Sequence, residues 1–295
     1  MNARVQFAAP MTLEDAFTVI SALGSGAALI AGGQELMPAL NLGEFEPTVL
    51  IDITNIDELE GIELDAGSLS IGALSTHRQV ERSQEVRQAA PLLAHSVAQI
   101  GGGWQVRNRG TIGGNIVSVH PLYDVLPALL ALHAKVEIAT AKGTTVTPVS
   151  DVILDASHGL GSKAILTRVI VDTAAPWDGW GYSKLKATSG DYASATAAAL
   201  VRTGSGDRPA EVRLIVSSVE ALPRDLSALA TDIVAKHAGD ALGDRIEAAV
   251  EAAITAPLDD HKGGADYRRA MAGVVAARAI AQAIATADSP KEPAA

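Results

Sequence analysis

The sequence predicts a protein of two domains in which helices and strands are mixed, and three observations lead to this prediction. The chain has 295 residues, a length at which two domains are commoner than one. Hydrophobic residues make up 48% of the chain, which is enough for sizeable cores. Residues 174–180 (AAPWDGW) interrupt the run of helix and strand patterns, so we place a domain boundary near residue 175.

The N-terminal domain is expected to begin with a helix over 12–23, because Thr12 suits an N-cap and apolar residues follow at helical spacing. Alternating and short apolar runs predict strands, and glycines predict the turns between them. The elements expected next are a strand at 27–31, a short helix at 35–42, a strand at 48–53, a hairpin at 60–74 turning at Gly67, and helical residues 78–100 broken at Pro91.

The rest of the chain continues in the same mixed pattern. A glycine-rich loop is predicted at 101–115, followed by a helix at 124–134, paired strands KVEIAT and TTVTPV, and a strand at 164–173. Beyond the boundary, residues 182–200 fit a strand or a helix equally well. A glycine-rich turn (TGSGD), a strand (EVRLIVSSV), helices at 224–238, 241–254 and 265–287, and a disordered tail at 289–295 complete the prediction.

Composition excludes several classes of protein. The formal net charge is -11, which disfavours nucleic-acid binding and docking on an anionic membrane. The sequence contains no cysteine, so the chain cannot carry a disulfide, a thiolate nucleophile or a cysteine-ligated iron–sulfur cluster. No apolar run approaches the roughly 18 residues of a membrane span, and the N-terminus lacks the pattern of a secretory signal. We therefore expect a cytoplasmic protein with no membrane association.

Two of the Gly-Gly segments in the sequence suggest a binding site. The first, Gly32-Gly33, follows a predicted strand and precedes a predicted helix. Glycines in such a loop allow backbone N–H groups to approach an anion closely. The segment does not match the dinucleotide-binding fingerprint, because the third glycine and the later acidic residue are missing. Taken alone, the segment is explained better by an ordinary tight turn than by an anion site.

The second segment, Thr111-Ile112-Gly113-Gly114-Asn115, offers the same exposed amides together with two polar side chains. Asp124, further along, could accept hydrogen bonds from ribose hydroxyls or cap the next helix, and the sequence favours neither. Two such segments in one domain suggest that a diphosphate is held from two sides. A P-loop lysine and its metal-binding hydroxyl are missing, which favours a bound diphosphate that does not react.

Six stretches occur in order along almost the whole chain: LIAGGQELMPAL, VLIDITNIDELEGIE, LSIGAL, IGGGWQVRNRGTIGGNIVSVHPLYDVLPALLALHAKVEI, GYSKLKATSGDYASATAAAL and ADYRRAMAGV. Together they resemble the FAD-binding (medium) subunits of the xanthine dehydrogenase and carbon monoxide dehydrogenase family. The resemblance implies an α+β chain. An FAD-binding domain of the vanillyl-alcohol-oxidase-like type (1–175, with subdomains at about 1–57 and 58–175) would precede a small α+β C-terminal flavoprotein domain (176–288).

The resemblance also implies a set of cofactor-binding residues and no catalytic residue on this chain. The diphosphate would lie at the two glycine segments, the adenosine ribose region at Asp124, and the flavin at Leu166. Lys184 or Lys186 would lie near the isoalloxazine edge, and Tyr192 near the ring face. The full set is Leu29, Ile30, Ala31, Gly32, Gly33, Gln34, Glu35, Leu36, Gly101, Thr111, Ile112, Gly113, Gly114, Asn115, Asp124, Leu166, Lys184 and Lys186.

In this family the organic substrate is oxidised on a large molybdopterin subunit, and two 2Fe–2S clusters on a small subunit relay electrons to the FAD. The resemblance thus implies two partner subunits in a dimer of heterotrimers, and it leaves the substrate and the electron acceptor undefined by this chain. The lack of cysteine fits this division of labour. A stand-alone FAD oxidoreductase of the same fold is the alternative, although no acid–base cluster for a substrate is evident.

Many relatives carry an Arg-Arg or Arg-Lys pair just before the Gly-Asp of GDYA. Here those positions are Ala187, Thr188 and Ser189, and only Lys186 is nearby. Residues 162–163 (Ser-Lys) replace a common Gly-Glu pair. Both departures bear on the flavin edge rather than on the glycine segments. The histidines lack paired metal-ligand spacing, so no metal site is predicted.

Overall fold

The structure, a computed structural model, describes residues 5–23, 26–154, 160, 163–204 and 209–289. Its residues gather into two compact units. The first unit is built from the chain up to Ala89, together with Gly102–Val119 and His133–Thr173. The second unit is built from Ala90–Gly101, His120–Leu132 and the chain from Ala174 onward. Each unit is described in turn.

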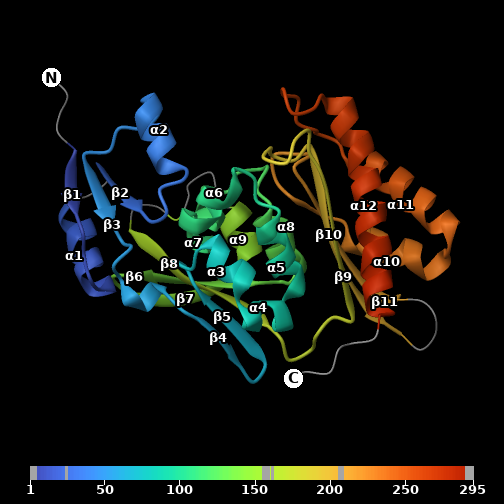
Figure 1. The fold of residues 1–295 in the computed structure, drawn as a ribbon, viewed down its shortest axis with the longest axis horizontal. Coiled ribbons are helices and arrows are strands. Elements are labelled where there is room, and N and C mark those ends of the chain that lie inside the picture. Colours follow the sequence, from blue (N-terminus) through green and yellow to red (C-terminus); the bar gives the residue numbers. More distant parts are fainter. Residues whose placement is uncertain (1–4, 24–25, 155–159, 161–162, 205–208, 290–295) are drawn as a thin grey trace. The chain divides into compact units, whose positions relative to one another are not determined.

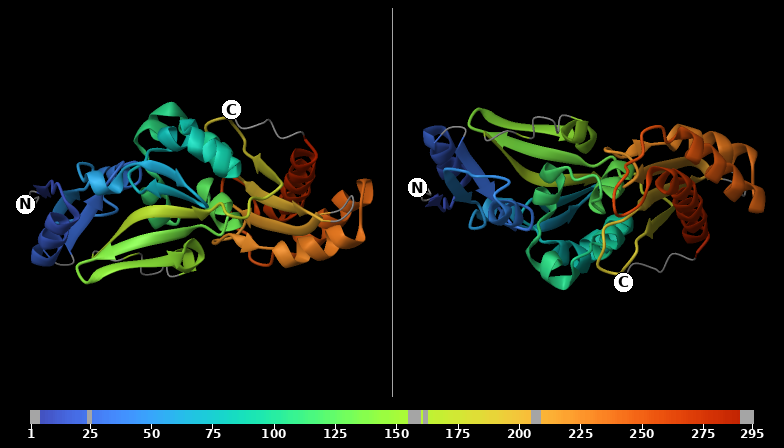
Figure 2. Two further views of the ribbon diagram at one scale, coloured as in Figure 1. Left: turned by 90° about the horizontal axis from the view of Figure 1, so that it is seen from below. Right: turned by 90° about the horizontal axis from the view of Figure 1, so that it is seen from above.

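The first unit begins with a three-stranded parallel sheet in the order β1-β3-β2. The strands are β1 (Gln6–Ala8), β2 (Ala27–Ile30) and β3 (Val49–Asp52), followed by the short 3-10 helix η2 (Asp57–Leu59). Helix α1 (Leu13–Leu23) lies against this sheet (Figures 1 and 2) and begins where the Thr12 hydroxyl accepts a 3.1 Å bond from the Asp15 amide. Helix α2 (Leu36–Leu42) follows β2. The predicted order of helix, strand, glycine loop, helix and strand is confirmed.

A five-stranded antiparallel sheet, in the order β4-β5-β8-β6-β7, forms the rest of the first unit. Its strands are β4 (Ile62–Asp65), β5 (Ser68–Gly72), β6 (Lys135–Thr140), β7 (Gly143–Pro148) and β8 (Ala164–Asp172). Both predicted hairpins are present. The first turns at Gly67, whose φ of 94° is a backbone conformation that favours glycine.

Helices α3 (His77–Arg82), α4 (Gln84–Ala89), α6 (Gly103–Arg109), α7 (Ile112–Ser118) and α9 (Val149–Leu154) accompany this sheet. The loop predicted at 101–115 is therefore wrong, since most of it is helical. Thr111 caps α7 by accepting a 3.2 Å bond from the Gly114 amide. A Cβ built at Gly113 would lie 2.7 Å from the Cβ of Ala73, so the glycine lets the helix pack closely there.

The second unit is built on a four-stranded antiparallel sheet in the order β12-β11-β10-β9. The strands are β9 (Gly179–Leu185), β10 (Ala195–Thr203), β11 (Pro209–Ser217) and β12 (Arg224–Asp225). The segment 182–200, which the sequence left open between strand and helix, therefore belongs mainly to two strands. The helices are α5 (Pro91–Ala98), α8 (Val125–Ala131), α10 (Ser227–Lys236), α11 (Asp240–Ala253) and α12 (Ala265–Ala287).

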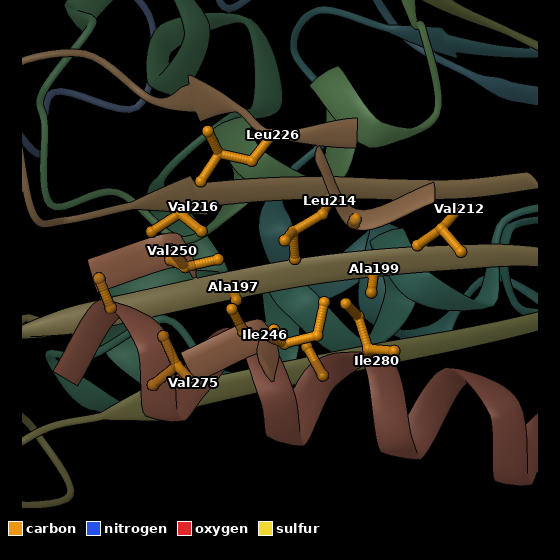
Figure 3. Close-up of a cluster of buried hydrophobic side chains, with 14 of the residues drawn as sticks. Ala197, Ala199, Val212, Leu214, Val216, Leu226, Ile246, Val250, Val275 and Ile280 are labelled. Carbon is orange, nitrogen blue, oxygen red and sulfur yellow. The ribbon is translucent and has the colours of Figure 1, made fainter. Parts of the chain in front are cut away.

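Both faces of this sheet are buried, because alternate residues of β10 pack into different clusters. Ala197 and Ala199 face a cluster that contains Ile280 of α12 (Figure 3). Ala198 and Leu200 face a second cluster, to which α5 and α8 contribute. The two helical segments from the middle of the chain thus complete the core of the second unit.

Helix α12 covers the edge strand β9. The amides of Trp180 and Tyr182 donate to the side chains of Thr286 (2.8 Å) and Gln282 (2.9 Å), which satisfies donors that an edge strand leaves unpaired. A Cβ at Gly181 would lie 2.0 Å from the Ala279 carbonyl oxygen. Within the described residues α12 alone has the length and composition of a membrane span, and its contacts with β9, β10 and α11 make it the core helix of this unit.

Three sequence predictions involve residues outside those described. The disordered tail at 289–295 lies outside from residue 290 onward, and the turn TGSGD lies outside from residue 205 onward. Of the Ser-Lys pair at 162–163, which replaces a common Gly-Glu pair, residue 162 lies outside the described residues.

Candidate functional site

The first glycine segment forms the turn between β2 and α2 and borders a pocket. Gly33 has a φ of 69°, a backbone conformation that residues other than glycine rarely adopt. Among the described residues, the backbone N–H groups of Gly32, Gly33 and Gln34 make no hydrogen bond. Consecutive amides with a left-handed residue among them are a common way to bind an anion. The pocket has a volume of about 410 Å³ and is lined by Ile30, Ala31, Gly32, Gly33, Gln34, Met37, Pro38 and Arg109.

The second glycine segment reaches the first through the residues that precede it. A Cβ at Gly32 would lie 2.1 Å from the carbonyl oxygen of Arg109 and 3.0 Å from the Cα of Gly110. The turn at Arg109-Gly110, which leads into Thr111, therefore packs directly on the first loop. The predicted approach of the two segments is present in the first unit, with Arg109 as the positive charge on the pocket wall.

The second segment does not present free amides, as the sequence had suggested. The Gly113 amide donates to the Ala73 carbonyl at 2.9 Å, and the Gly114 amide donates to Thr111. A different group is left without a partner, because Asn115 Oδ1 is buried and makes no hydrogen bond to any described residue. At Gly114 an added Cβ would meet only Thr111 Oγ1, at 3.0 Å. This segment can therefore accept a ligand beside Gly114 and Asn115, but not through its backbone N–H groups.

The remaining predicted residues of the first unit fall around these two segments. Leu29 and Ile30 end β2, Glu35 precedes α2, and Leu36 opens it. Leu166 is buried in β8, paired with Ile138.

His77 lies beneath the second segment and was assigned no role from the sequence. Its backbone amide donates to the Gly110 carbonyl at 2.9 Å, and its ring lies where a Cβ of Gly110 would come within 3.0 Å. Burial, followed by the positive charge of Arg107, lowers the pKa of His77 to about 4. The imidazole is therefore neutral at physiological pH and acts as packing under the turn.

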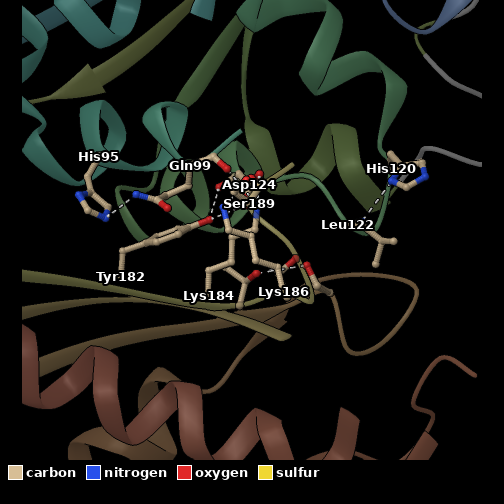
Figure 4. A network of polar contacts seen from close by, with 12 residues as sticks. His95, Gln99, His120, Leu122, Asp124, Tyr182, Lys184, Lys186 and Ser189 are labelled. Carbon is tan, nitrogen blue, oxygen red and sulfur yellow. Dashed lines mark hydrogen bonds and ion pairs between the residues drawn. The ribbon is translucent and has the colours of Figure 1, made fainter. Parts of the chain in front are cut away.

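Asp124 and Lys184, both predicted to contact the cofactor, form a buried ion pair in the second unit (Figure 4). Lys184 Nζ lies 2.7 Å from Asp124 Oδ1, and the two side chains are 3% and 4% exposed. Lys184 also donates to the Gln99 carbonyl at 3.1 Å, and the Tyr182 hydroxyl donates to Asp124 Oδ1 at 3.1 Å. The pair thus joins β9 to the start of α8 and the end of α5.

The pKa values around this ion pair are set first by burial. Burial raises the pKa of Asp124 even though Lys184 and Tyr182 stabilise the carboxylate. Burial lowers the pKa of Lys184 against the opposing charge of Asp124, and burial together with the Asp124 charge raises the pKa of Tyr182. Tyr182 was missed in the sequence, although it stands two residues before Lys184 and so on the same face of the strand.

The other predicted residues of the second unit lie near the loop that joins β9 and β10. A Cβ at Gly101 would lie 2.5 Å from the Gly190 carbonyl oxygen, so this loop packs on Gly101. Lys186 Nζ donates to the Ser189 carbonyl at 3.1 Å. Tyr192 is 43% exposed, and its ring stacks on His120 at a centroid distance of 5.3 Å.

Fold and site together define an α+β protein with a pocket lined by the first glycine segment and Arg109. Comparison with known families then assigns the chain. Residues 3–173 match the family described as the FAD binding domain in molybdopterin dehydrogenase, and residues 180–283 match the CO dehydrogenase flavoprotein C-terminal domain. The chain belongs to this family of oxidoreductase subunits. The resemblance stated from the sequence, the α+β fold class and FAD as the cofactor are confirmed.

Individual relatives agree with this assignment. The chain is 35% identical to the carbon monoxide dehydrogenase medium chain of Hydrogenophaga pseudoflava, covering 94% of this chain and 96% of the relative. It is 28% identical to the nicotine 6-hydroxylase medium subunit of Paenarthrobacter nicotinovorans, covering 95% and 97%. Among solved structures, the carbon monoxide dehydrogenase from Hydrogenophaga pseudoflava gives a TM-score of 0.89 at 32% identity, covering 97% of this chain and 99% of that chain.

Proposed function

We propose that this protein is the FAD-carrying electron-transfer subunit of a heterotrimeric molybdenum hydroxylase. It would take electrons from 2Fe–2S clusters on a small partner subunit and pass them to an external acceptor, while a large subunit holds the molybdopterin. Bound FAD supplies the redox chemistry, because it can accept and release electrons in single steps or in pairs. The observation that carries the proposal is the match to medium chains over nearly the full length of both proteins.

The pocket fits the FAD diphosphate on three counts. The unbonded amides of Gly32 to Gln34 offer donors, Arg109 offers a positive charge, and the glycine backbone leaves room for close approach. Asn115 Oδ1 is buried and lacks a partner within the described chain; as an acceptor, it suits a hydroxyl or N–H group of the cofactor rather than the diphosphate. In this proposal the chain binds and orients the cofactor, and none of its residues acts as an acid or a base.

The partners and the domain limits belong to the same proposal. The absence of cysteine from the sequence requires that any 2Fe–2S cluster of the usual cysteine-ligated kind lies on another subunit. We propose a cytoplasmic dimer of heterotrimers without membrane attachment. The FAD-binding domain would span residues 1–175, with subdomains at about 1–57 and 58–175, and the C-terminal domain 176–288. The two family matches end and begin on either side of residue 175.

Lysine contacts to the cofactor are proposed for the second unit. Of the two lysines predicted for the isoalloxazine edge, Lys184 already pairs with Asp124 in a buried site, whereas Lys186 bonds only a loop carbonyl in the described chain. Lys186 is therefore the better candidate for a direct contact. If Asp124 binds the ribose, its carboxylate must do so while it is paired with Lys184.

The proposal is tested by the FAD content of the chain purified together with its co-purifying partners. The wild-type preparation should be yellow and should release about one FAD per chain on denaturation, the occupancy of a single tight site. A colourless preparation that takes up no added FAD would refute the proposal. Direct reduction of the flavin by a small substrate, in this chain alone, would support the stand-alone oxidoreductase instead.

Two substitutions then test the pocket itself. Gly114→Val places a Cβ that meets only Thr111 Oγ1, at 3.0 Å, so the chain should fold once that hydroxyl shifts slightly. FAD affinity should fall at least tenfold, a change of about 1.4 kcal/mol. Gly33→Asn is the second variant, because asparagine adopts the left-handed backbone more readily than valine does. It should also lower FAD affinity. Gly32→Ala is no clean probe, because its Cβ would strike the Arg109 backbone.

The matched control is Gly243→Val, which makes the same change in the first turns of α11 where a Cβ meets nothing within 4 Å. It should retain wild-type FAD. Normal FAD content in both Gly114→Val and Gly33→Asn would remove the glycine segments from the cofactor site.

A further inference from the structure

Two segments about 70 residues apart, both in the second unit, are joined by a dense set of polar contacts. The first is the loop 186–194 between β9 and β10, which carries Tyr192, and the second is the loop 254–264 between α11 and α12. Lys262 forms an ion pair with Asp191. The Ser194 hydroxyl donates to the Lys262 carbonyl at 2.6 Å. The first loop is thus held on both sides of Tyr192.

Arg268, at the start of α12, contacts the same two loops through its buried side chain. Its side chain is fully buried and lies among backbone carbonyls. It donates to the Ser194 carbonyl at 2.9 Å and to the Gly263 carbonyl at 3.0 Å, and it pairs with Asp260 at 2.6 Å. A guanidinium presents several donors in a fixed planar fork, so a single side chain orders both loops at once.

A third contact of Arg268 fixes a strained residue. Ser218, which is buried and follows β11, has a φ of 65°, and its carbonyl accepts a hydrogen bond from Arg268. Non-glycine residues in this region persist only where their surroundings fix them, and they cluster at functional sites. The bond from Arg268 is part of what fixes this backbone.

The ion pairs that join the two loops should persist over a wide pH range. The hydrogen bond from Lys262 lowers the pKa of Asp191. Burial raises the pKa of Asp260, but the bonds from Arg268 and the Lys262 amide outweigh it and leave the pKa lowered. Both carboxylates therefore stay ionised, and paired with cations, well below neutral pH.

The consequence is that an exposed aromatic ring is held in one place. Ala193, next to Tyr192, is fully buried, whereas Tyr192 itself is 43% exposed. The Tyr192 ring stacks on His120 and also on Tyr123, at a centroid distance of 6.2 Å and an angle of 24°. Three stacked rings with one exposed member form a flat apolar surface of the kind that stacks on another planar ring.

We propose that the loop 254–264 and Arg268 are positioning elements that fix Tyr192, so that its ring is presented ready-oriented to the planar ring of the cofactor. Lys262 and Asp191 form the outer half of this clamp and Arg268 forms the inner half. The part of the proposal that concerns the cofactor rests on the proposed FAD function, whereas the clamp itself does not.

The experiment opens the outer half alone, because loss of Arg268 could unfold the unit. Lys262→Met and Asp191→Asn remove the ion pair and leave the backbone contacts of Arg268 intact. Lys236→Met is the matched control, since it removes an ion pair with Asp232 on the exposed surface of α10. Hydrogen–deuterium exchange of the peptide that covers 186–194 is measured in the complex as purified.

Exchange of this peptide should rise about fivefold in Lys262→Met and in Asp191→Asn, as expected for the loss of one partly buried ion pair from a locally opening segment. Exchange of β10 and β11 should not change, and Lys236→Met should match the wild type. Equal exchange in Lys262→Met and Lys236→Met would overturn the clamp, and this result needs no bound cofactor.

A spectroscopic measurement tests the link to the cofactor. Tyr192→Leu first defines the part of the visible circular dichroism of the flavin that depends on the tyrosine. Lys262→Met should shift the same band in the same direction while the FAD content stays at the wild-type level. If exchange rises but this band does not move, the loop is clamped without positioning Tyr192 for the flavin. A wild-type preparation without FAD would refute the proposed function and leave the exchange result standing.

Discussion

The buried His77 predicts that acid weakens the first unit at the second glycine segment. The side chain is 3% exposed, and its Nδ1 makes no hydrogen bond to any described residue. Burial and then Arg107 lower its pKa to about 4 from the ordinary value of 6.5. Protonation of the ring in the folded protein would place a charge beside the Arg107 guanidinium, under the Gly110 turn.

The sign of the effect follows from proton linkage. A base whose pKa is lower in the folded state than in the unfolded state binds fewer protons when folded, so folding is favoured above the unfolded pKa. This stability is fully present above pH 6.5 and is lost as the pH falls toward 4. For a difference of about 2.5 pKa units, lowering the pH from 7.5 to 4.5 should cost about 2.5 kcal/mol of the free energy of unfolding.

The assay is the urea dependence of hydrogen exchange at β5 and β8, which reports the unfolding of the first unit alone. It is repeated at several pH values between 7.5 and 4.5 for the wild type and for His77→Gln. The glutamine side chain does not titrate, so the loss of stability with falling pH should be smaller in this variant by the amount just estimated. His237→Gln, in the second unit, serves as the control. An equally steep pH dependence in His77→Gln would refute the reasoning.

Two predictions concern the second unit. Lys184→Met should destabilise it by about 3–5 kcal/mol, because it leaves the Asp124 carboxylate buried without its cation. In urea denaturation, a Lys184→Met/Asp124→Leu double variant should recover much of this lost stability. No recovery would mean that the pair contributes chiefly through Gln99 and Tyr182. Gly181→Ala should lower the stability of the same unit by about 3 kcal/mol, because its Cβ would overlap the α12 backbone. Gly190→Ala, where a Cβ meets nothing within 4 Å, is its control, and a thermal midpoint equal to that of the control would contradict the contact.

Local patterns in the sequence predicted most of the helices and strands correctly. The last helix was predicted at 265–287 and is found at Ala265–Ala287, because a long alanine-rich run without proline, interrupted only by Gly273, strongly favours a helix. The hairpin at Gly67 was predicted because alternation and a turn residue coincide. In both cases the deciding information lies within a few residues of the element itself.

The second glycine segment was mispredicted for the opposite reason. Glycine is a poor helix former, so local propensity favours a loop at Gly113-Gly114. Packing outweighs propensity here, since the Thr111 cap and the contact with Ala73 both require the helical path. No pattern near residue 113 reveals that strand β5 ends beside it, and the anion-binding role of these amides was therefore expected in the wrong place.

The pairing of Asp124 with Lys184 lay beyond sequence reasoning altogether. Each residue was singled out separately, for opposite ends of the cofactor, because 60 positions separate them and neither shows a periodic signal that points to the other. Their 2.7 Å contact has a consequence for the remaining assignments. A buried charge that is already paired is a weak binding partner for a ligand. Truncating either residue should destabilise the fold, whether or not it contacts the cofactor. Loss of flavin in a Lys184 or Asp124 variant would therefore not identify a cofactor contact, whereas Lys186, Gly114 and Asn115, which lie outside this ion pair, can be changed to ask that question directly.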